Sequence, residues 1–160
     1  MSHTRVRMSV PTEALRQDHR RIRDLLREYS AVSPDDRNRR DWLFERIHRE
    51  ILLHFALEEE VLYPAVQKKG AERAMESVEE ARWGHRLLRQ LLTELSQMSS
   101  EERSFDAKMG MLQTNLEHYM ESEEKSVFPE VRDMSREMKD ALRARLESVR
   151  ERLLEGEQRG

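Results

Sequence analysis

The stretch His54-Phe55-Ala56-Leu57-Glu58-Glu59-Glu60-Val61-Leu62-Tyr63-Pro64 decides how this chain folds. It places a histidine and a glutamate four residues apart on the apolar stripe of a helix, so both side chains point the same way. Upstream, Leu43, Ile47 and Ile51 continue the stripe with helical spacing. The pattern predicts a helix with two polar groups on its buried face. We expect it to stop near Tyr63-Pro64, because proline disfavours helical geometry in the residue before it.

The chain contains this helix twice. A shift of 65 residues places the segment on a later one without a gap, and a shift of 66 relates the helices that precede each copy. The paired positions include Ile51 and Leu116, Glu58 and Glu123, Tyr63 and Phe128, Pro64 and Pro129, His19 and His85, and Arg23 and Arg89. Two packed copies of a helical hairpin make an antiparallel up-and-down four-helix bundle.

A fifth amphipathic segment follows, carrying Met138, Leu142, Leu146, Val149 and Leu153. The fold class predicted is therefore all-α, a four-helix bundle with a short additional C-terminal helix. We expect a flexible N-terminal tail over residues 1–11, one domain over residues 12–155, and a frayed end over residues 156–160.

Composition excludes several classes of protein. Among 160 residues, 37% are hydrophobic and 38% are charged, with a net charge of -3 and no basic tract, so no nucleic-acid partner is expected. No apolar run is long enough to cross a membrane. The absence of cysteine excludes disulfides, thiolate zinc sites and iron–sulfur clusters. Together with the absence of a signal peptide, this predicts a cytoplasmic protein, as a monomer or weak homo-oligomer.

Polar side chains interrupt the apolar stripes at six positions: His19, His54, Glu58, His85, Tyr119 and Glu123. Buried carboxylates need cations or hydrogen-bond donors. Helices that run antiparallel would bring these groups to one level of the interior. Mixed imidazole and carboxylate ligands suit iron or a similar ion, and two carboxylates on opposing helices can each bridge two metals. The six residues are therefore predicted to be metal ligands. Glu59 and Glu124 are expected at the surface or just behind the ligands.

These motifs resemble the hemerythrin-like, or HHE, cation-binding family over roughly residues 12–135. The pieces that carry the resemblance are Asp18-His19-Arg20-Arg21-Ile22, His54 to Pro64, Gly84-His85-Arg86-Leu87-Leu88, and Glu123-Glu124-Lys125-Ser126-Val127-Phe128-Pro129. The resemblance implies two iron ions in an oxo- or hydroxo-bridged centre, which reacts with peroxide, dioxygen or nitric oxide.

The fourth motif departs from the family pattern, which would place histidine where this chain has Tyr119. Two alternatives stay open. Tyr119 binds metal as a phenolate, as the gapless repeat favours, or a one-residue π-bulge turns His118 inward. Otherwise His118 is expected on the flank of the helix, as a proton-handling catalytic group.

A tyrosinate ligand stabilises ferric iron, whereas a reversible oxygen carrier must rest in the ferrous state. The leading hypothesis is therefore decomposition of hydrogen peroxide in defence against oxidants. The alternative is a module that binds, senses or stores dioxygen or nitric oxide without turnover.

Overall fold

The computed structural model describes residues 10–159, which contain helices and no β-strand, so the prediction of an all-α protein is confirmed. Its long helices are α1 (Thr12–Ala31), α2 (Arg37–Leu57), α4 (Glu72–Gln97), α5 (Arg103–Ser126) and α7 (Arg136–Gln158). The shorter segments are η1 (Glu58–Leu62), α3 (Tyr63–Lys69) and α6 (Phe128–Arg132). The expected N-terminal tail lies almost wholly outside the described residues.

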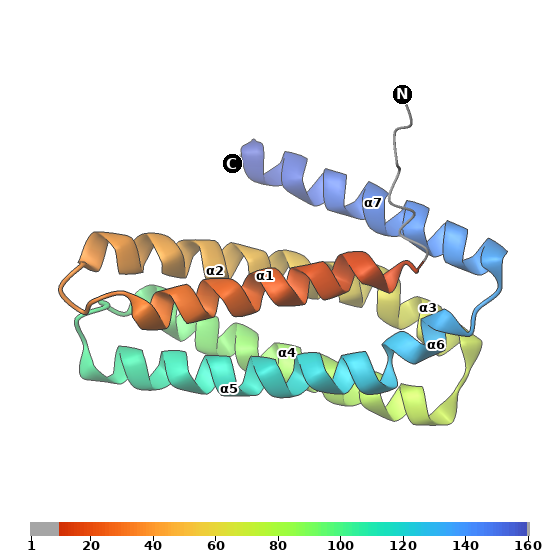
Figure 1. Cartoon of the computed structure of the whole chain (residues 1–160), viewed down its shortest axis with the longest axis horizontal. Helices are drawn as coiled ribbons and strands as arrows, with labels where there is room; N and C mark the ends of the chain where they lie inside the picture. The colour runs from red at the N-terminus through yellow and green to blue at the C-terminus, as the bar shows by residue number, and fades with distance from the viewer. Residues whose placement is uncertain (1–9, 160) are drawn as a thin grey trace.

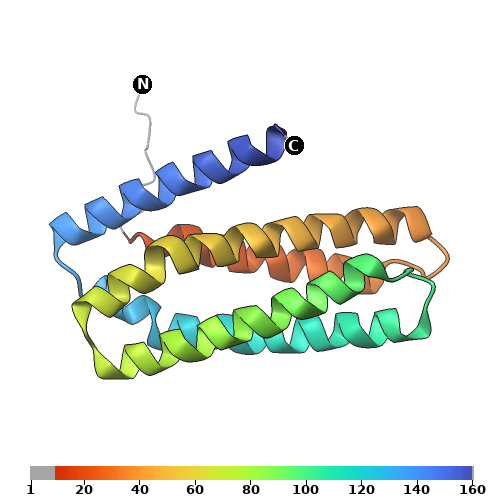
Figure 2. The same cartoon turned by 180° about the vertical axis from the view of Figure 1, so that it is seen from behind.

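Helices α1, α2, α4 and α5 lie side by side along the long axis of the molecule (Figures 1 and 2). Contacts join α1 to α2, α2 to α4, α4 to α5 and α5 to α1, so these helices close a ring around a shared interior. Helix α7 lies outside the ring, against α2 and η1. It is not the short helix expected, because it runs for 23 residues and continues to Gln158, through most of the end that was expected to fray. Within residues 10–159, no helix is long and apolar enough to cross a membrane.

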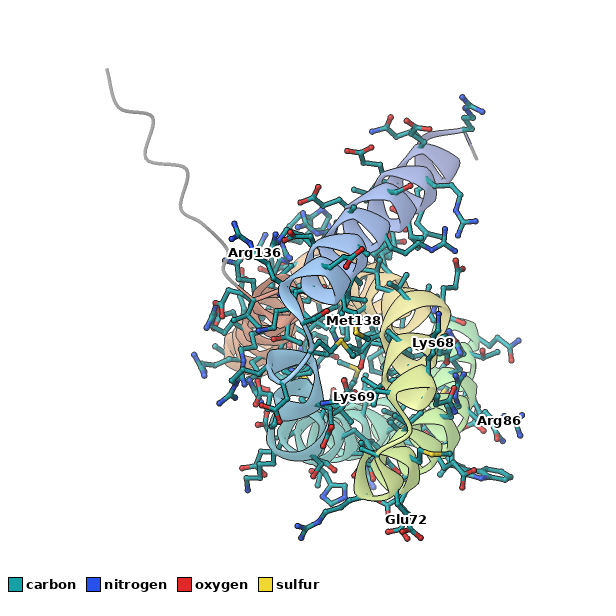
Figure 3. All side chains as sticks on the ribbon, turned by 90° about the vertical axis from the view of Figure 1, so that its right-hand side faces the viewer. Lys68, Lys69, Glu72, Arg86, Arg136 and Met138 are labelled. Atoms are coloured by element: carbon teal, nitrogen blue, oxygen red, sulfur yellow. The ribbon has the colours of Figure 1, made fainter. Side chains whose placement is uncertain are left out.

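Figure 3 views the end of the molecule at which α7 begins, marked by Arg136 and Met138. The same end carries the last turn of α3, marked by Lys68 and Lys69. Leu142, Leu146 and Val149 of α7 are buried in one apolar cluster with side chains of α1, η1, α3, α4 and α6. Helix α7 therefore packs against the end of the ring at which the short segments η1, α3 and α6 lie.

The predicted stop at Pro64 is wrong. Helix α2 continues through the π-helix η1 into α3, which ends only at Gly70, in the left-handed region with φ 78°. Pro64, which has no amide hydrogen to donate, directly follows the π-helical hydrogen bond from Tyr63 to Glu58, so the change of helix type coincides with the proline. By contrast, α5 does end at Ser126, close to the expected stop before Pro129.

Two apolar clusters fill the interior, one near each end of the ring. On every ring helix, a buried polar residue lies between a side chain of one cluster and a side chain of the other. On α1, for example, His19 lies between Leu15 and Ile22, and on α4 His85 lies between Ala81 and Leu88. The interior therefore has a polar layer with apolar packing on both sides.

Candidate metal centre

The polar layer is made of five side chains that water barely reaches. Their exposed fractions are 3% or less, and they are His19 on α1, His54 on α2, Glu58 at the start of η1, His85 on α4 and Glu123 on α5. Each occupies a position where the helix pattern calls for an apolar residue. Their burial therefore needs a specific chemical explanation.

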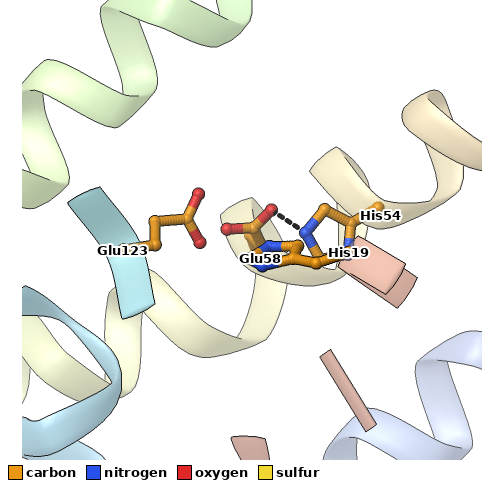
Figure 4. A group of neighbouring side chains, drawn as sticks. All are labelled: His19, His54, Glu58 and Glu123. Atoms are coloured by element: carbon orange, nitrogen blue, oxygen red, sulfur yellow. Dashed lines mark ion pairs between the residues drawn. The ribbon is translucent and has the colours of Figure 1, made fainter. Parts of the chain in front are cut away.

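These side chains converge on one point. Ligand atoms of His19, His54, Glu58 and Glu123 all lie within 4.8 Å of one another. Figure 4 shows the carboxylates of Glu58 and Glu123 facing each other from η1 and α5, with the two imidazoles beside Glu58. His85 approaches from α4, with its Nε2 4.0 Å from Oε1 of Glu58. Five of the six predicted ligands thus lie together.

A phenol that the sequence analysis did not assign, that of Tyr63, completes the group. The Tyr63 hydroxyl lies 2.9 Å from Glu58 Oε2, 3.0 Å from Glu123 Oε1 and 3.3 Å from His85 Nε2. The π-helix η1 explains the position of the Tyr63 side chain, because a π-helical turn brings residues five apart, here Glu58 and Tyr63, onto one face. The amide of Tyr63 donates to the carbonyl of Glu58, which is the hydrogen bond of such a turn.

Each imidazole is held from behind by a carboxylate. Nδ1 of His19 lies 3.1 Å from Glu124, Nδ1 of His54 lies 3.1 Å from Asp18, and Nδ1 of His85 lies 2.9 Å from Glu59. An ionised carboxylate can only accept, so each Nδ1 must donate its hydrogen. The opposite nitrogen, Nε2, is then directed at the centre. This is the arrangement that fixes metal-binding histidines and makes them more basic.

Arginines neutralise the three outer carboxylates. Arg23 contacts Glu124, Arg89 lies 2.6 Å from Glu59, and Arg150 of α7 lies 2.7 Å from Asp18. Burial opposes ionisation of these carboxylates, but the hydrogen bonds from the histidines, together with those from the arginines, outweigh it. They hold the pKa of Asp18 well below its usual range and lower the pKa of Glu59 and of Glu124 to about 2. The inner pair, Glu58 and Glu123, has no arginine partner among the described residues.

The inner atoms lack partners. Of six buried side-chain atoms without a hydrogen bond in residues 10–159, four belong to this centre: Nε2 of His19, Nε2 of His54, Oε1 of Glu58 and Oε2 of Glu123. His54 Nε2 and Glu58 Oε1 approach to 2.5 Å, but without hydrogen-bond geometry. Such orphaned lone pairs are rare in a folded protein. The residues present therefore fit a bound cation.

Protons compensate in the absence of a metal. Burial opposes a charge on His54, but Glu58 and Asp18 outweigh it and raise its pKa to about 9. Burial, together with the neighbouring Glu58, raises the pKa of Glu123 well above its ordinary value. Burial lowers the pKa of His19, which keeps that ring neutral. The centre as a whole is too electron-rich to remain without positive charge.

The structure places Tyr119 and His118 elsewhere. Tyr119 is half-buried, and its ring lies against the backbone of α4 at Gly84, where an added Cβ would lie 2.3 Å from a ring carbon. His118 is exposed beside Trp83 and the Tyr119 ring, on the outer face of α4 and α5. Helix α5 stays a regular α-helix through both positions, so the π-bulge interpretation is wrong. The π-helix occurs in the other copy of the repeat, after His54.

The repeat explains why the Tyr119 ring lies beside α4 and not in the centre. In the first copy, His54 is paired with Asp18. The equivalent positions in the second copy hold Tyr119 and Gly84, so histidine and its carboxylate partner are both absent. Without a side chain at Gly84, the Tyr119 ring occupies the space beside α4. This coupled change is the signal in the sequence that could have argued against Tyr119 as a ligand.

An interior layer of imidazoles and carboxylates inside a ring of helices defines a helical cation-binding protein. The model of the family described as Hemerythrin HHE cation binding domain matches residues 10–131, and the chain belongs to this family.

One solved structure is similar over almost its whole length, that of the Hemerythrin HHE cation binding domain-containing protein from Mycobacterium kansasii. The two chains are 25% identical and superpose with a TM-score of 0.71, covering 91% of this chain and 90% of that one. No curated protein matches the sequence significantly.

Proposed function

We propose that the centre holds two non-haem iron ions and decomposes hydrogen peroxide. The ligands would be His19, His54, His85, Glu58 and Glu123, and the oxygen of Tyr63 would take the place that the sequence analysis gave to Tyr119. The observation that carries the proposal is the Tyr63 hydroxyl, which lies within 3.3 Å of atoms from three of these residues.

The donor set supports two ions rather than one. Three imidazoles and two carboxylates exceed the four ligands of a closed zinc site. The inner carboxylates also carry two negative charges that only protons or metal ions can balance, because the arginines neutralise the outer carboxylates. Mixed nitrogen and oxygen donors of this kind suit first-row metals such as iron.

Tyr63, bound as a phenolate, would disfavour reversible oxygen transport. A phenolate oxygen, with imidazoles made more basic by Asp18, Glu59 and Glu124, favours the ferric over the ferrous state. Bound iron would supply the redox chemistry that converts two molecules of hydrogen peroxide into two of water and one of dioxygen.

The chain's own residues would manage protons and water. On binding metal, Tyr63 would release its hydroxyl proton, and Glu58 or Glu123, both within 3.0 Å of its oxygen, would accept that proton. Phe55 stacks on His85 and Phe128 stacks on His19, so apolar rings cover two of the imidazoles and keep bulk water away from them. These contacts favour reaction with a small ligand over hydrolysis of a large substrate.

The test is oxygen evolution from hydrogen peroxide by the iron-loaded protein. We expect two irons per chain and a rate well above that of an equal concentration of free ferric iron. The same protein stripped of metal serves as the control. A rate no higher than that of free iron would remove the catalytic proposal.

The binding alternative rests on the same hydroxyl, which could donate a hydrogen bond to dioxygen or nitric oxide without turnover. Rapid mixing of the reduced protein with dioxygen separates the two. A spectrum that reverses when oxygen is removed supports binding, whereas prompt and irreversible oxidation supports redox catalysis.

A further inference from the structure

Helix α7 reaches the metal centre through one side chain. Arg150 donates two parallel hydrogen bonds to Asp18 on α1, of 3.1 Å to Oδ1 and 2.7 Å to Oδ2. This is the bidentate pairing that fixes a carboxylate in one orientation. The same Oδ2 accepts the hydrogen bond from Nδ1 of His54 at 3.1 Å. A continuous chain of contacts thus runs from Arg150 of α7 through Asp18 to the imidazole of His54.

The other two imidazoles are supported from within the ring of helices. Arg23 follows His19 by four residues, and Arg89 follows His85 by four, so each arginine lies one turn from the histidine it supports. The position one turn after His54 is Glu58, itself part of the centre. No arginine can therefore support His54 from its own helix at that spacing. Arg21 of α1 contacts one oxygen of Asp18, and Arg150 adds, from outside the ring, the pairing to both oxygens.

The docking of α7 fixes where Arg150 lies. Val149 is buried, with an exposed fraction of 3%, in the cluster that also contains Leu57 and Val61. Arg150 is the next residue, and its side chain is only 25% exposed. The helix also lies beyond residue 131, where the match to the family ends.

We propose that α7 is a positioning element for the metal centre and that Arg150 is its positioning residue, acting on His54 through Asp18. The proposal rests on the proposed function in so far as His54 binds metal. The proposal predicts that removing the hydrogen bonds from Arg150 to Asp18 weakens metal retention, although no metal ligand is replaced. Arg21 also contacts Asp18, at 2.7 Å, so the loss should be partial.

The experiment compares Arg150→Met with Arg152→Met. Arg152 lies on the same helix and pairs with Glu60 of η1, but that carboxylate contacts no histidine among the described residues. Iron-loaded full-length proteins are mixed with excess EDTA, and iron release is followed. We expect release from Arg150→Met to be roughly 3- to 10-fold faster, below the effect typical of losing the carboxylate itself. Arg152→Met should match the wild type.

Two further measurements exclude a general structural effect. Arg150→Lys should fall between wild type and Arg150→Met, because an ammonium group cannot bridge both oxygens as a guanidinium does. In the metal-free proteins, the hydrogen-bonded Nδ1 proton of His54 should give a low-field NMR signal that broadens only in the Arg150 variants.

The outcomes separate the two proposals. Equal iron release and an unchanged His54 signal in Arg150→Met would overturn the role of α7 and leave the di-iron proposal standing. A wild-type protein that takes up no iron would overturn the di-iron proposal, while the NMR signal would still report whether Arg150 orients His54.

Discussion

At the position of Tyr63, a single oxygen atom distinguishes the two copies of the repeat. Tyr63 occupies the position that Phe128 holds in the other copy. Phe128 stacks on His19 with ring centroids 5.5 Å apart, whereas Tyr63 reaches two carboxylates and His85 with its hydroxyl. The phenol is therefore added to a position that the repeat uses for apolar packing, and its loss should leave the packing intact.

Replacing Tyr63 with phenylalanine should remove this oxygen and little else. We expect peroxide decomposition to fall at least about 10-fold, because loss of a group that supports a metal centre typically costs about 10- to 100-fold in activity. The phenolate-to-iron absorption band expected of the wild type should disappear. Tyr119→Phe is the matched control and should leave both rate and band unchanged. A band that survives Tyr63→Phe but not Tyr119→Phe would restore Tyr119 as the ligand.

The outer carboxylates predict an acid limit to the stability of the metal-free protein. The pKa values of Glu59 and Glu124 fall from 4.5 to about 2 in the folded state. Because the folded state prefers the ionised form, the stabilisation is present above pH 4.5 and is lost as the pH falls toward 2.

Urea unfolding of metal-free wild type should therefore show a falling free energy of unfolding between pH 5 and pH 3. The double variant Glu59→Gln/Glu124→Gln should be less stable at pH 7, by roughly 1–3 kcal/mol for each lost charge-assisted hydrogen bond. Its stability should also change less over the same pH range. Parallel pH profiles for the two proteins would contradict the assignment.

Packing between α4 and α5 depends on Gly84 lacking a side chain. Glycine inside a helix is ordinarily less favourable than alanine by about 1 kcal/mol. At Gly84 the order should reverse, because a Cβ would lie 2.3 Å from a carbon of the Tyr119 ring. Gly110 in α5 has no atom within 4 Å of the corresponding Cβ and is the matched control.

We expect Gly84→Ala to destabilise the protein by about 1–3 kcal/mol, whereas Gly110→Ala should stabilise it by up to about 1 kcal/mol. In a Tyr119→Ala background, Gly84→Ala should no longer be destabilising. Thermal unfolding of the wild type, Gly84→Ala, Tyr119→Ala and the double variant completes a double-mutant cycle that measures this coupling. A Gly84→Ala protein as stable as Gly110→Ala would show that Tyr119 does not pack on α4.

The helices show what periodicity can and cannot predict. Apolar spacing identified the long helices and placed His19, His54, His85, Glu58 and Glu123 on their buried faces. It could not find the π-turn after Leu57, because local spacing at a proline indicates a helix end and tertiary packing overrides that signal here. Tyr63 was missed as a consequence. The sequence does indicate Glu59 and Glu124 at the surface or just behind the ligands, but it does not indicate Asp18 and Arg150, which meet only through the docking of α7, 132 positions apart.

At the scale of the whole molecule, the polar layer makes stability depend on its cation. A ligand that binds only the folded state at 100 times its dissociation constant stabilises it by about 2.7 kcal/mol. For a protein of this size we expect the midpoint of thermal unfolding to rise by roughly 5–10 °C on iron loading. Calorimetry of metal-loaded and metal-stripped protein measures this shift, and coincident midpoints would contradict a metal held by the orphaned atoms.

The family model matches residues 10–131, but the structure that supports the metal centre extends beyond them into α7. A protein shortened to residues 10–131 would keep every proposed ligand and the closed ring of helices, yet it would lack the guanidinium that holds Asp18. It would also uncover apolar side chains such as Leu57 and Val61, which now pack in one cluster with Leu146 and Val149. We expect such a fragment to retain iron less well than the full chain and to aggregate more readily through its exposed apolar surface.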